Sequence, residues 1–411
     1  MNADVDIVIV GGGAAGVGAA RRLAGSGLSS LLLEATSRLG GRAWTQEIRG
    51  LDLDLGCGWM HSAERNSWAG IAKATGVPIE QSRAAWGVQY RNLGFPPAEQ
   101  AEAWKAFEAW NLRLAQSPPA TDCAADALDP GCEWNTHIRA IVSFISGATL
   151  ERLSAADYVA YDESSSEYNW RLRSGYGALV ARSFPRGVSL GLATPVESIA
   201  LAAEGVTLAT PTGAIRARAA ILTVSTAVLS GDALQLPGEL DPWREAARQL
   251  PLGLNEKLFF EILGEAPFEA ETHVTGNPRD ERTASYYIRP YGWPVIECFF
   301  GGERARLLAE EGLAAGFGYA LDQLSSLFGS EIRPRLRPLA GSCWSRTASV
   351  GGAYSYALPG HVSARQKLAQ PFEQRLFFAG EATSPGDFST AHGAHDSGIR
   401  AANEAIVALV R

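Results

Sequence analysis

Three glycines near the start of the chain have the spacing of a nucleotide-binding turn. Gly11, Gly13 and Gly16 follow the β-branched run 5–10 (VDIVIV) and open a helix-like stretch. At this spacing Gly11 permits a tight turn, Gly13 lets the backbone approach a pyrophosphate, and Gly16, helped by Gly18, lets the helix pack close to the strand. The N–H groups and the dipole at the helix start favour phosphate.

An acid completes this pattern: Glu34 ends a second apolar run, 31–33. It is placed to accept a hydrogen bond from a ribose hydroxyl, and its charge disfavours a 2′-phosphorylated cofactor. Arg38 and Arg42 then flank a flexible Gly-Gly pair, and a second cationic loop is what a longer dinucleotide needs beside its pyrophosphate. The residues expected to bind the cofactor here are Gly11, Gly13, Ala14, Ala15, Gly16, Glu34, Ala35, Arg38, Gly40, Gly41 and Arg42.

With this E-x-x-x-R-x-G-G-R run at 34–42, the chain resembles the flavin-dependent amine oxidase family. The resemblance implies an FAD cofactor. It continues in the L-G-x-x-W-x-H run at 55–61, typical of the polyamine and spermine oxidase branch, and implies that His61 lies near the substrate channel. A partly buried histidine that hydrogen-bonds a loop explains His61 equally well, and Ser62 replaces the usual glycine. Expected beside the cofactor are Gly58, Trp59 and Met60.

A lysine inside an apolar run is the next candidate. Lys257 lies in an expected strand, 251–260, where its ammonium needs a partner to offset desolvation. A lysine that points to solvent at the start of the strand would give the same residue pattern. The family's G-x-x-x-K pattern is matched by Gly253 and Lys257, and the resemblance implies that this lysine holds a water against the flavin N5 atom.

An aromatic run at 344–356 resembles the W…G-x-Y-S-Y pattern of polyamine oxidases. The resemblance implies that Tyr354 forms one wall of an aromatic cage, whose π face attracts and orients the amine. A tyrosine that packs a domain interface is the alternative. Monoamine oxidases carry a flavin-bonded cysteine where this chain has Ala353, so the FAD is expected to be non-covalent.

The closing motif, 377–398, is expected to form a strand, a loop and a helix that runs to the C-terminus. The resemblance implies that Gly380 and Glu381 bind the ribityl or pyrophosphate part of FAD. It also implies that the helix start at Thr390 and Ala391 directs its dipole at the flavin. Thr390 stands where monoamine oxidases have a second cage tyrosine, which disfavours primary monoamines.

Three further positions have a candidate role. The family holds the adenine with the backbone at the position of Val196. His392 and His395 lie three apart on the terminal helix, but they lack a third partner for a metal, so no metal site is expected. We expect both histidines to be polar residues that face the flavin or the solvent.

The elements that must position these residues alternate between two units. The predicted fold is α/β, a Rossmann-type FAD-binding domain (1–75, 176–250 and 371–411) interleaved with an α+β substrate-binding domain (76–175 and 251–370). Helices are expected at 68–74, 98–114, 136–144, 304–313 and 318–327, and strands at 195–199, 205–208, 219–224 and 293–300. Expected to pack in the helical core are Trp104, Phe107 and Trp110. Weak candidates to bind a distal ammonium, in what reads as a solvated loop, are Glu163 and Glu167.

Composition limits the remaining possibilities. The 411 residues, 46% of them apolar and 19% charged, suit a two-domain globular protein. Runs long enough for a membrane helix or a secretory signal are not found, so a cytoplasmic location without membrane contact is expected. A net charge of −8 disfavours nucleic acid. Five cysteines without a C-x-x-C pair suggest neither a disulfide framework nor zinc.

The resemblance implies hydride transfer from a carbon next to a neutral amine to flavin N5, with molecular oxygen as the acceptor and hydrogen peroxide as a product. The expected substrate is a small-molecule amine, a polyamine or secondary amine being favoured, and the sequence favours no oligomeric state. Three alternatives are an L-amino acid oxidase, a desaturase or porphyrinogen-type oxidase, and a non-catalytic flavoprotein or NAD-binding regulator. The first should place an arginine after the L-G motif, where 58–61 offers none.

Overall fold

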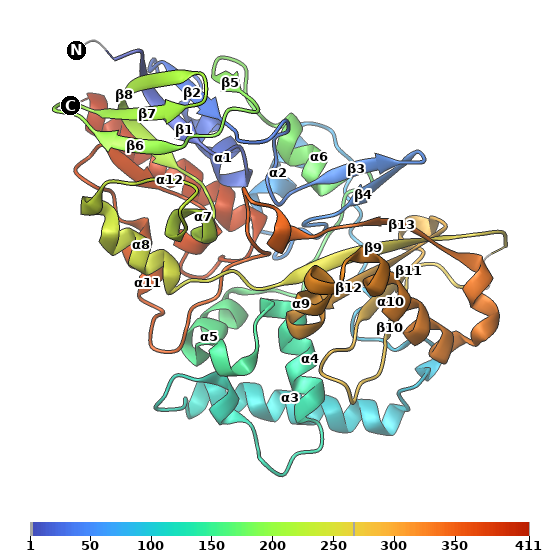
Figure 1. Cartoon of the computed structure of the whole chain (residues 1–411). Coiled ribbons are helices and arrows are strands. Elements are labelled where there is room, and N and C mark those ends of the chain that lie inside the picture. The colour runs from blue at the N-terminus through green and yellow to red at the C-terminus, as the bar shows by residue number, and fades with distance from the viewer. Residues whose placement is uncertain (1–2, 266–267, 411) are drawn as a thin grey trace.

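The β-branched residues near the N-terminus form the central strand of a sheet that three distant parts of the chain build. In the computed structural model, which describes residues 3–265 and 268–410, β1 (Val5–Val10) lies between β2 (Ser30–Leu33) and β8 (Gly213–Leu222), both parallel to it. Blue, green and red segments meet in this unit (Figure 1). The strand order is β5-β2-β1-β8-β7-β6, with β14 beside β8. The other strands are β5 (Ser189–Gly191), β6 (Ser198–Leu201), β7 (Val206–Thr210) and β14 (Leu376–Phe378).

Glycines set how closely α1 (Ala14–Leu23) packs. A Cβ on Gly16 would lie 1.9 Å from the carbonyl oxygen of Gly11, so Gly16 lets α1 pass close to the end of β1, as its spacing predicts. Gly18 faces α12 (Ala391–Val410) instead, because its Cβ would lie 2.3 Å from the carbonyl oxygen of His395. The prediction that Gly18 helps α1 pack on the strand is therefore wrong: it allows two helices to touch backbone to backbone.

Helices cover both faces of this sheet, and β1 contributes alternate residues to each side. Ile7 and Ile9 pack with α1, α12, α2 (Ser67–Ala74) and α6 (Tyr176–Arg182). Val8 and Val10 pack with α7 (Thr226–Ser230), α8 (Asp241–Arg248) and α11 (Ala364–Ala369). The helix α11 comes from the segment expected in the second unit, yet it packs in the core of the first.

The second unit is an antiparallel sheet with strand order β10-β11-β12-β9-β13. On one face it packs against two helices, α9 and α10, and α3, α4 and α5 form a helical group at its foot (Figure 1). The strands are β9 (Asn255–Ile262), β10 (Thr272–Thr275), β11 (Ser285–Ile288), β12 (Val295–Gly301) and β13 (Leu336–Gly341). The helices are α3 (Pro97–Gln116), α4 (Asn135–Ser146), α5 (Ala155–Ser164), α9 (Gly302–Glu311) and α10 (Leu313–Phe328).

A hairpin joins the two units. It consists of β3 (Thr45–Ile48) and β4 (Leu51–Asp54), which lie in the first segment of the chain. Leu53 and Leu55 pack with Phe259 and Val295 of the second sheet. The hairpin therefore carries the residues after Asp54 into the space between the units.

The aromatic residues of α3 divide between core and surface. Phe107 and Trp110 are buried, as expected, but Trp104 is 59% exposed and stacks on Phe107. The prediction that Trp104 packs in the core is wrong, because its side chain lines a cavity between the two units. Among helices within the described residues, none is long and apolar enough to cross a bilayer.

Candidate active site

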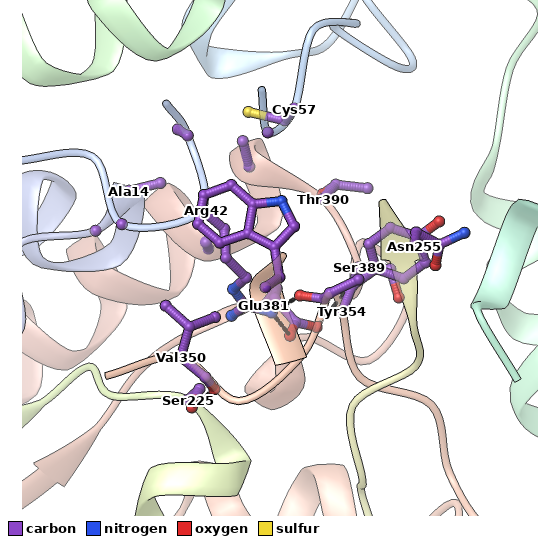
Figure 2. Close-up of a pocket in the computed structure, with 18 of the residues that line it drawn as sticks. Ala14, Arg42, Cys57, Ser225, Asn255, Val350, Tyr354, Glu381, Ser389 and Thr390 are labelled. Atoms are coloured by element: carbon purple, nitrogen blue, oxygen red, sulfur yellow. Dashed lines mark hydrogen bonds and ion pairs between the residues drawn. The ribbon is translucent and has the colours of Figure 1, made fainter. Parts of the chain in front are cut away.

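A cavity of about 920 Å³ lies between the two units and contains most of the residues that the sequence singles out. We call its two ends the glycine end, lined by Gly13, Glu34 and Val196, and the sheet end, lined by Lys257 and Tyr354. Figure 2 shows Ala14 on one side of this cavity, with Asn255 and Tyr354 on the other. The expected site residues that line it are Gly11, Gly13, Ala14, Ala15, Glu34, Ala35, Arg38, Gly40, Gly41, Arg42, Gly58, Trp59, His61, Val196, Lys257, Tyr354, Gly380, Glu381, Thr390 and Ala391.

Two expected site residues do not line the cavity. Gly16 does not reach the cavity, but it lets α1 pack closely against the end of β1. Met60 is fully buried in the core beside α1 and α2, and its backbone N–H and C=O both pair with Trp170. The expectation that Met60 contacts the cofactor is therefore wrong, because the loop after β4 directs alternate side chains inward and only its neighbours Trp59 and His61 reach the cavity.

The glycine end has the features that a dinucleotide requires. The N–H of Val17 bonds to the carbonyl of Gly13, so the N–H groups of Ala14 and Ala15 have no acceptor within the helix and lie at the cavity wall. A Cβ on Gly13 would meet only the carbonyl oxygen of Gly40, 3.9 Å away, so the turn is open toward the cavity. The backbone N–H and C=O of Val196 have no hydrogen-bond partner among the described residues. These free groups fit the pyrophosphate and adenine of FAD.

Glu34 has a second role that the sequence did not suggest. Its carboxylate accepts hydrogen bonds from the backbone N–H of Gly12 at 2.7 Å and of Thr36 at 2.8 Å. These bonds join the glycine turn to the loop after β2. The ribose contact of Glu34 stays a prediction, and the same carboxylate also holds the shape of the turn.

An ion pair lies in the middle of the cavity wall. Arg42 contacts Glu381 at 3.0 Å and also donates to the carbonyl of Ala353 (Figure 2). Burial alone would raise the pKa of Glu381, but the Arg42 charge and the hydrogen bonds from Ser355 and Ser389 hold it below its ordinary value. Glu381 is therefore a charged residue whose hydrogen bonds and ion pair hold the surrounding loops together.

Lys257 has the partner that its burial requires. It is 7% exposed on β9, and its Nζ lies 2.8 Å from Oε1 of Glu297 on β12. The same nitrogen donates to the carbonyl of Asp54 at 3.2 Å. Lys257 lines the cavity, so the alternative that it points to solvent is wrong.

The sequence analysis missed the face that surrounds this lysine. Alternate residues of the second sheet face the cavity, while those between them, such as Leu258, Cys298 and Tyr286, pack in the core. The residues on the cavity face are Asn255, Lys257, His273, Thr275, Ser285, Tyr287, Glu297 and Phe299. Period-two alternation of polar and apolar residues was the signal that could have found them.

Tyr354 lies at the cavity wall, and its hydroxyl donates to the carbonyl of Phe144 at 2.7 Å. Burial raises the pKa of its phenol well above the usual value. Its neighbour Ala353 has no thiol that could bond covalently to a flavin. Cys57 lines the cavity as well, but burial raises the pKa of its thiol to about 12, so it stays protonated and unreactive.

The three conspicuous histidines differ in position. His61 lines the cavity and hydrogen-bonds Asn169 at 2.7 Å; burial lowers its pKa, so the ring is neutral. His392 and His395 are buried and outside the cavity lining. The expectation that these two face the flavin or the solvent is wrong. His392 lies against Asp387, and His395 lies edge-on against a buried tryptophan of α2, Trp68.

Aromatic and acidic residues form the outer part of the sheet end. Trp86, 39% exposed, lies edge-on to Trp59 with ring centroids 4.4 Å apart. Asp162, at the end of α5, lines the cavity and accepts from Asn111. The two acids considered from the sequence, Glu163 and Glu167, are exposed and do not line it.

Comparison with known proteins agrees with this geometry. A family model of flavin containing amine oxidoreductases matches residues 80–406, and a model of NAD(P)-binding Rossmann-like domains matches residues 9–74. The chain belongs to the flavin containing amine oxidoreductase family. It is thus an FAD-dependent amine oxidoreductase.

The relatives of this amine oxidoreductase carry several names. The chain is 27% identical to polyamine oxidase 4 of Oryza sativa subsp. japonica over 438 residues, which cover 97% of this chain and 88% of the relative. It is 24% identical to polyamine oxidase 2 of Arabidopsis thaliana over 439 residues, covering 97% and 87%. A shorter match, 46% identical over 81 residues, covers 20% of this chain and 16% of a pseudooxynicotine dehydrogenase of Pseudomonas sp.

Proposed function

We propose that the protein oxidises a secondary amine or a polyamine at the carbon next to its nitrogen. The observation that carries this proposal is the continuity of the cavity from the open glycine turn to the polar face of the second sheet, with Lys257 and Tyr354 at that end. FAD supplies the hydride acceptor when bound. The product is an iminium, which water hydrolyses to an aldehyde and an amine.

The walls of the sheet end favour an uncharged amine. Phe144, Ile145 and Phe299 line this part, and a charged ammonium loses more solvation there than a neutral amine does. Burial lowers the pKa of His61, and that of His273 to about 4, so neither ring adds positive charge. The chain's contribution is then to orient the amine, to exclude water, and to keep one donor, the Lys257 ammonium, in the cavity, where it would hold a water.

The same wall argues against an amino acid substrate. A substrate carboxylate needs a cation that is free to bind it. Among the described residues that line the cavity, Arg42 is paired with Glu381, Lys257 is paired with Glu297, and Arg38 lies over the Trp44 ring at the glycine end. An unpaired arginine at the sheet end, which an L-amino acid oxidase should have, is not present among them.

The electron acceptor is the second part of the proposal. We infer that molecular oxygen reoxidises the enzyme and yields hydrogen peroxide. One relative with a local match is named a dehydrogenase, so the acceptor deserves a direct comparison between oxygen and an artificial acceptor. The cytoplasmic location expected from the sequence stays a prediction.

The test is an anaerobic titration of the purified holoenzyme with polyamines, secondary amines, primary monoamines and amino acids, followed by flavin absorbance. Bleaching by a polyamine or secondary amine, with recovery and peroxide formation in air, is the expected result. Intact bound FAD that no amine reduces would exclude the proposal and favour a non-catalytic flavoprotein or a desaturase. If the flavin is reoxidised only by an artificial acceptor, the proposed amine substrate stands, but oxygen is excluded as the acceptor.

A further inference from the structure

Glu297 and Lys257 occupy diagonal positions on neighbouring strands. In the antiparallel register Lys257 on β9 lies opposite Phe299 on β12, and Glu297 lies opposite Phe259. Residues two apart on facing strands share one side of a sheet, within reach of long side chains. The ion pair between them measures 2.8 Å, and both side chains line the cavity.

Stability alone does not account for this pair. The Lys257 side chain is 9% exposed and that of Glu297 19%, so both charges lose much of their hydration. Replacing such a buried pair with apolar residues is usually neutral or stabilising, whereas removing one partner is costly. The flanking residues Phe259 and Phe299 are apolar, so a carboxylate here suggests that the lysine's charge itself is needed.

The surroundings fix the direction of the ammonium. The carbonyl of Asp54 accepts from Nζ at 3.2 Å, in addition to the ion pair with the Glu297 carboxylate. A Cβ on Gly58 would lie 3.2 Å from the same nitrogen, so the loop after β4 passes close over it. An ammonium has three N–H donors, and with two acceptors beside it one donor is left for the cavity.

We propose that Glu297 is a positioning residue that holds the Lys257 ammonium in place and directs its free N–H into the sheet end of the cavity. The inference rests on the proposed function, because it assigns a task to Lys257 in amine oxidation. Without the carboxylate, the Lys257 ammonium keeps only the Asp54 carbonyl as a partner and rotates more freely.

Few protein groups around the pair change charge at alkaline pH. Burial raises the pKa of Asp54 to about 6, against the hydrogen bond from Thr45 and the Lys257 charge, so its carboxyl is ionised above that pH. Burial likewise raises the pKa of Cys57 to about 12, and lowers that of His61. The other groups that face the pair keep one state between about pH 8 and pH 10, because burial lowers the pKa of His273 and raises those of Tyr287, Tyr291 and Cys298.

The experiment uses the holoenzyme with E297Q, K257M and the double variant. E261Q is the matched control, because the Glu261 side chain lies on the same sheet, is 17% exposed and is paired with arginines, but does not line the cavity. The first readout needs no substrate: the flavin absorbance of the resting enzyme is titrated with base. The flavin itself loses a proton from N3 at alkaline pH, and E297Q, which removes a negative charge from the cavity that holds the flavin, is expected to move this transition at least about one pH unit lower in the wild-type background and much less in the K257M background.

The second readout is the rate constant of anaerobic flavin reduction by the amine found above. E297Q should lower it about 10-fold or more in the wild-type background and by less than about 2-fold in the K257M background, since coupled residues are not additive. Equal loss in both backgrounds, or E297Q behaving as E261Q, would overturn the inference. If no amine reduces the wild-type enzyme, only the proposed function is excluded. The base titration needs no amine, so it still tests the role of Glu297. If E297Q does not fold, a folded double variant supports the pairing and an unfolded one overturns it.

Discussion

The Arg42 guanidinium lies 3.0 Å from the Glu381 carboxylate although 339 residues separate them in the chain. Glu381 also accepts hydrogen bonds from the backbone N–H of Ser355 at 3.1 Å and of Ser389 at 2.9 Å. A single buried carboxylate therefore joins the loop after β2, the Tyr354 loop and the segment that leads into α12. All of these segments line the cavity.

Replacing this carboxylate should loosen the site as a whole. We expect Glu381→Gln to cost about 3 kcal/mol of unfolding free energy at neutral pH, because Arg42 and the Ser389 N–H lose a charged acceptor. Since the pKa of Glu381 is lowered, the wild-type advantage is present at neutral pH and is lost as the pH falls through that pKa. Urea unfolding of the apoprotein measures this difference, and retention of FAD after gel filtration should fall with it.

The control for this substitution is Glu404→Gln, which removes a half-buried i,i+4 partner of Arg400 on α12. Helix ion pairs at this spacing contribute about 0.5 kcal/mol or less. Similar losses in the two variants would show that Glu381 does not join the segments as described.

A pair of glycine substitutions tests the nucleotide turn. Gly16→Ala would place a Cβ 1.9 Å from the carbonyl of Gly11, so the turn must open, and we expect FAD affinity to fall at least about 10-fold. Gly70→Ala, in α2, meets nothing within 4 Å and should stabilise the protein by about 0.5 to 1 kcal/mol. Binding of FAD to the apoproteins, followed by fluorescence quenching, compares them. Unchanged affinity in Gly16→Ala would contradict the close packing of α1 on β1.

The nucleotide half of the molecule could be predicted from the sequence because its signals are local. A strand, a glycine turn, a helix and an acid follow one another within 34 residues, and Gly16 meets a backbone contact, the carbonyl of Gly11, that a side chain would block. Glycine 18 illustrates the limit of this reasoning. It follows Gly16 by two residues on the same helix, but it contacts α12. That helix is almost the whole chain away in sequence, so the local residue pattern does not reveal the contact.

The sheet end was harder to predict for the same reason. Lys257 drew attention as a charge in an apolar strand, and the identical argument applies to Glu297 in V-I-E-C-F-F, yet strand pairing decides that the two meet. Met60 was placed incorrectly because a one-residue change of direction is not encoded in composition. The packing of α11 on the first sheet joins remote segments and leaves no local signal either. Trp104 was placed in the core because aromatic residues usually are, but its side of α3 lines the cavity instead.

The buried carboxyl of Glu256 should make stability depend on pH. Burial raises its pKa to about 7, against hydrogen bonds from Ser342 and from the backbone N–H of Trp344. An acid with a raised folded-state pKa stabilises the fold below its ordinary value and loses that contribution as the pH rises through about 7. Relative to wild type, Glu256→Gln should therefore gain about 2 to 3 kcal/mol between pH 5 and pH 8.

Urea unfolding of the two apoproteins at several pH values checks this prediction. Glu245→Gln, which alters a half-exposed acid on α8, should follow the wild type at every pH. A constant difference between wild type and Glu256→Gln across the range would mean that Glu256 titrates normally in the folded protein.

Asp162 decides whether the outer part of the cavity serves a second positive charge. Both Asp162 and its neighbour Glu163 are exposed at the end of α5, but only Asp162 lines the cavity. If the substrate is a polyamine, Asp162→Asn should raise KM for a triamine about 10-fold, the usual size of one charge-assisted contact, and leave kcat within about 2-fold because the reacting carbon is bound elsewhere. KM for a secondary monoamine should not change, and Glu163→Gln should alter neither substrate. Steady-state kinetics on the two variants measure this, and equal KM increases for both amines would mean that Asp162 shapes the entrance instead of binding a distal ammonium.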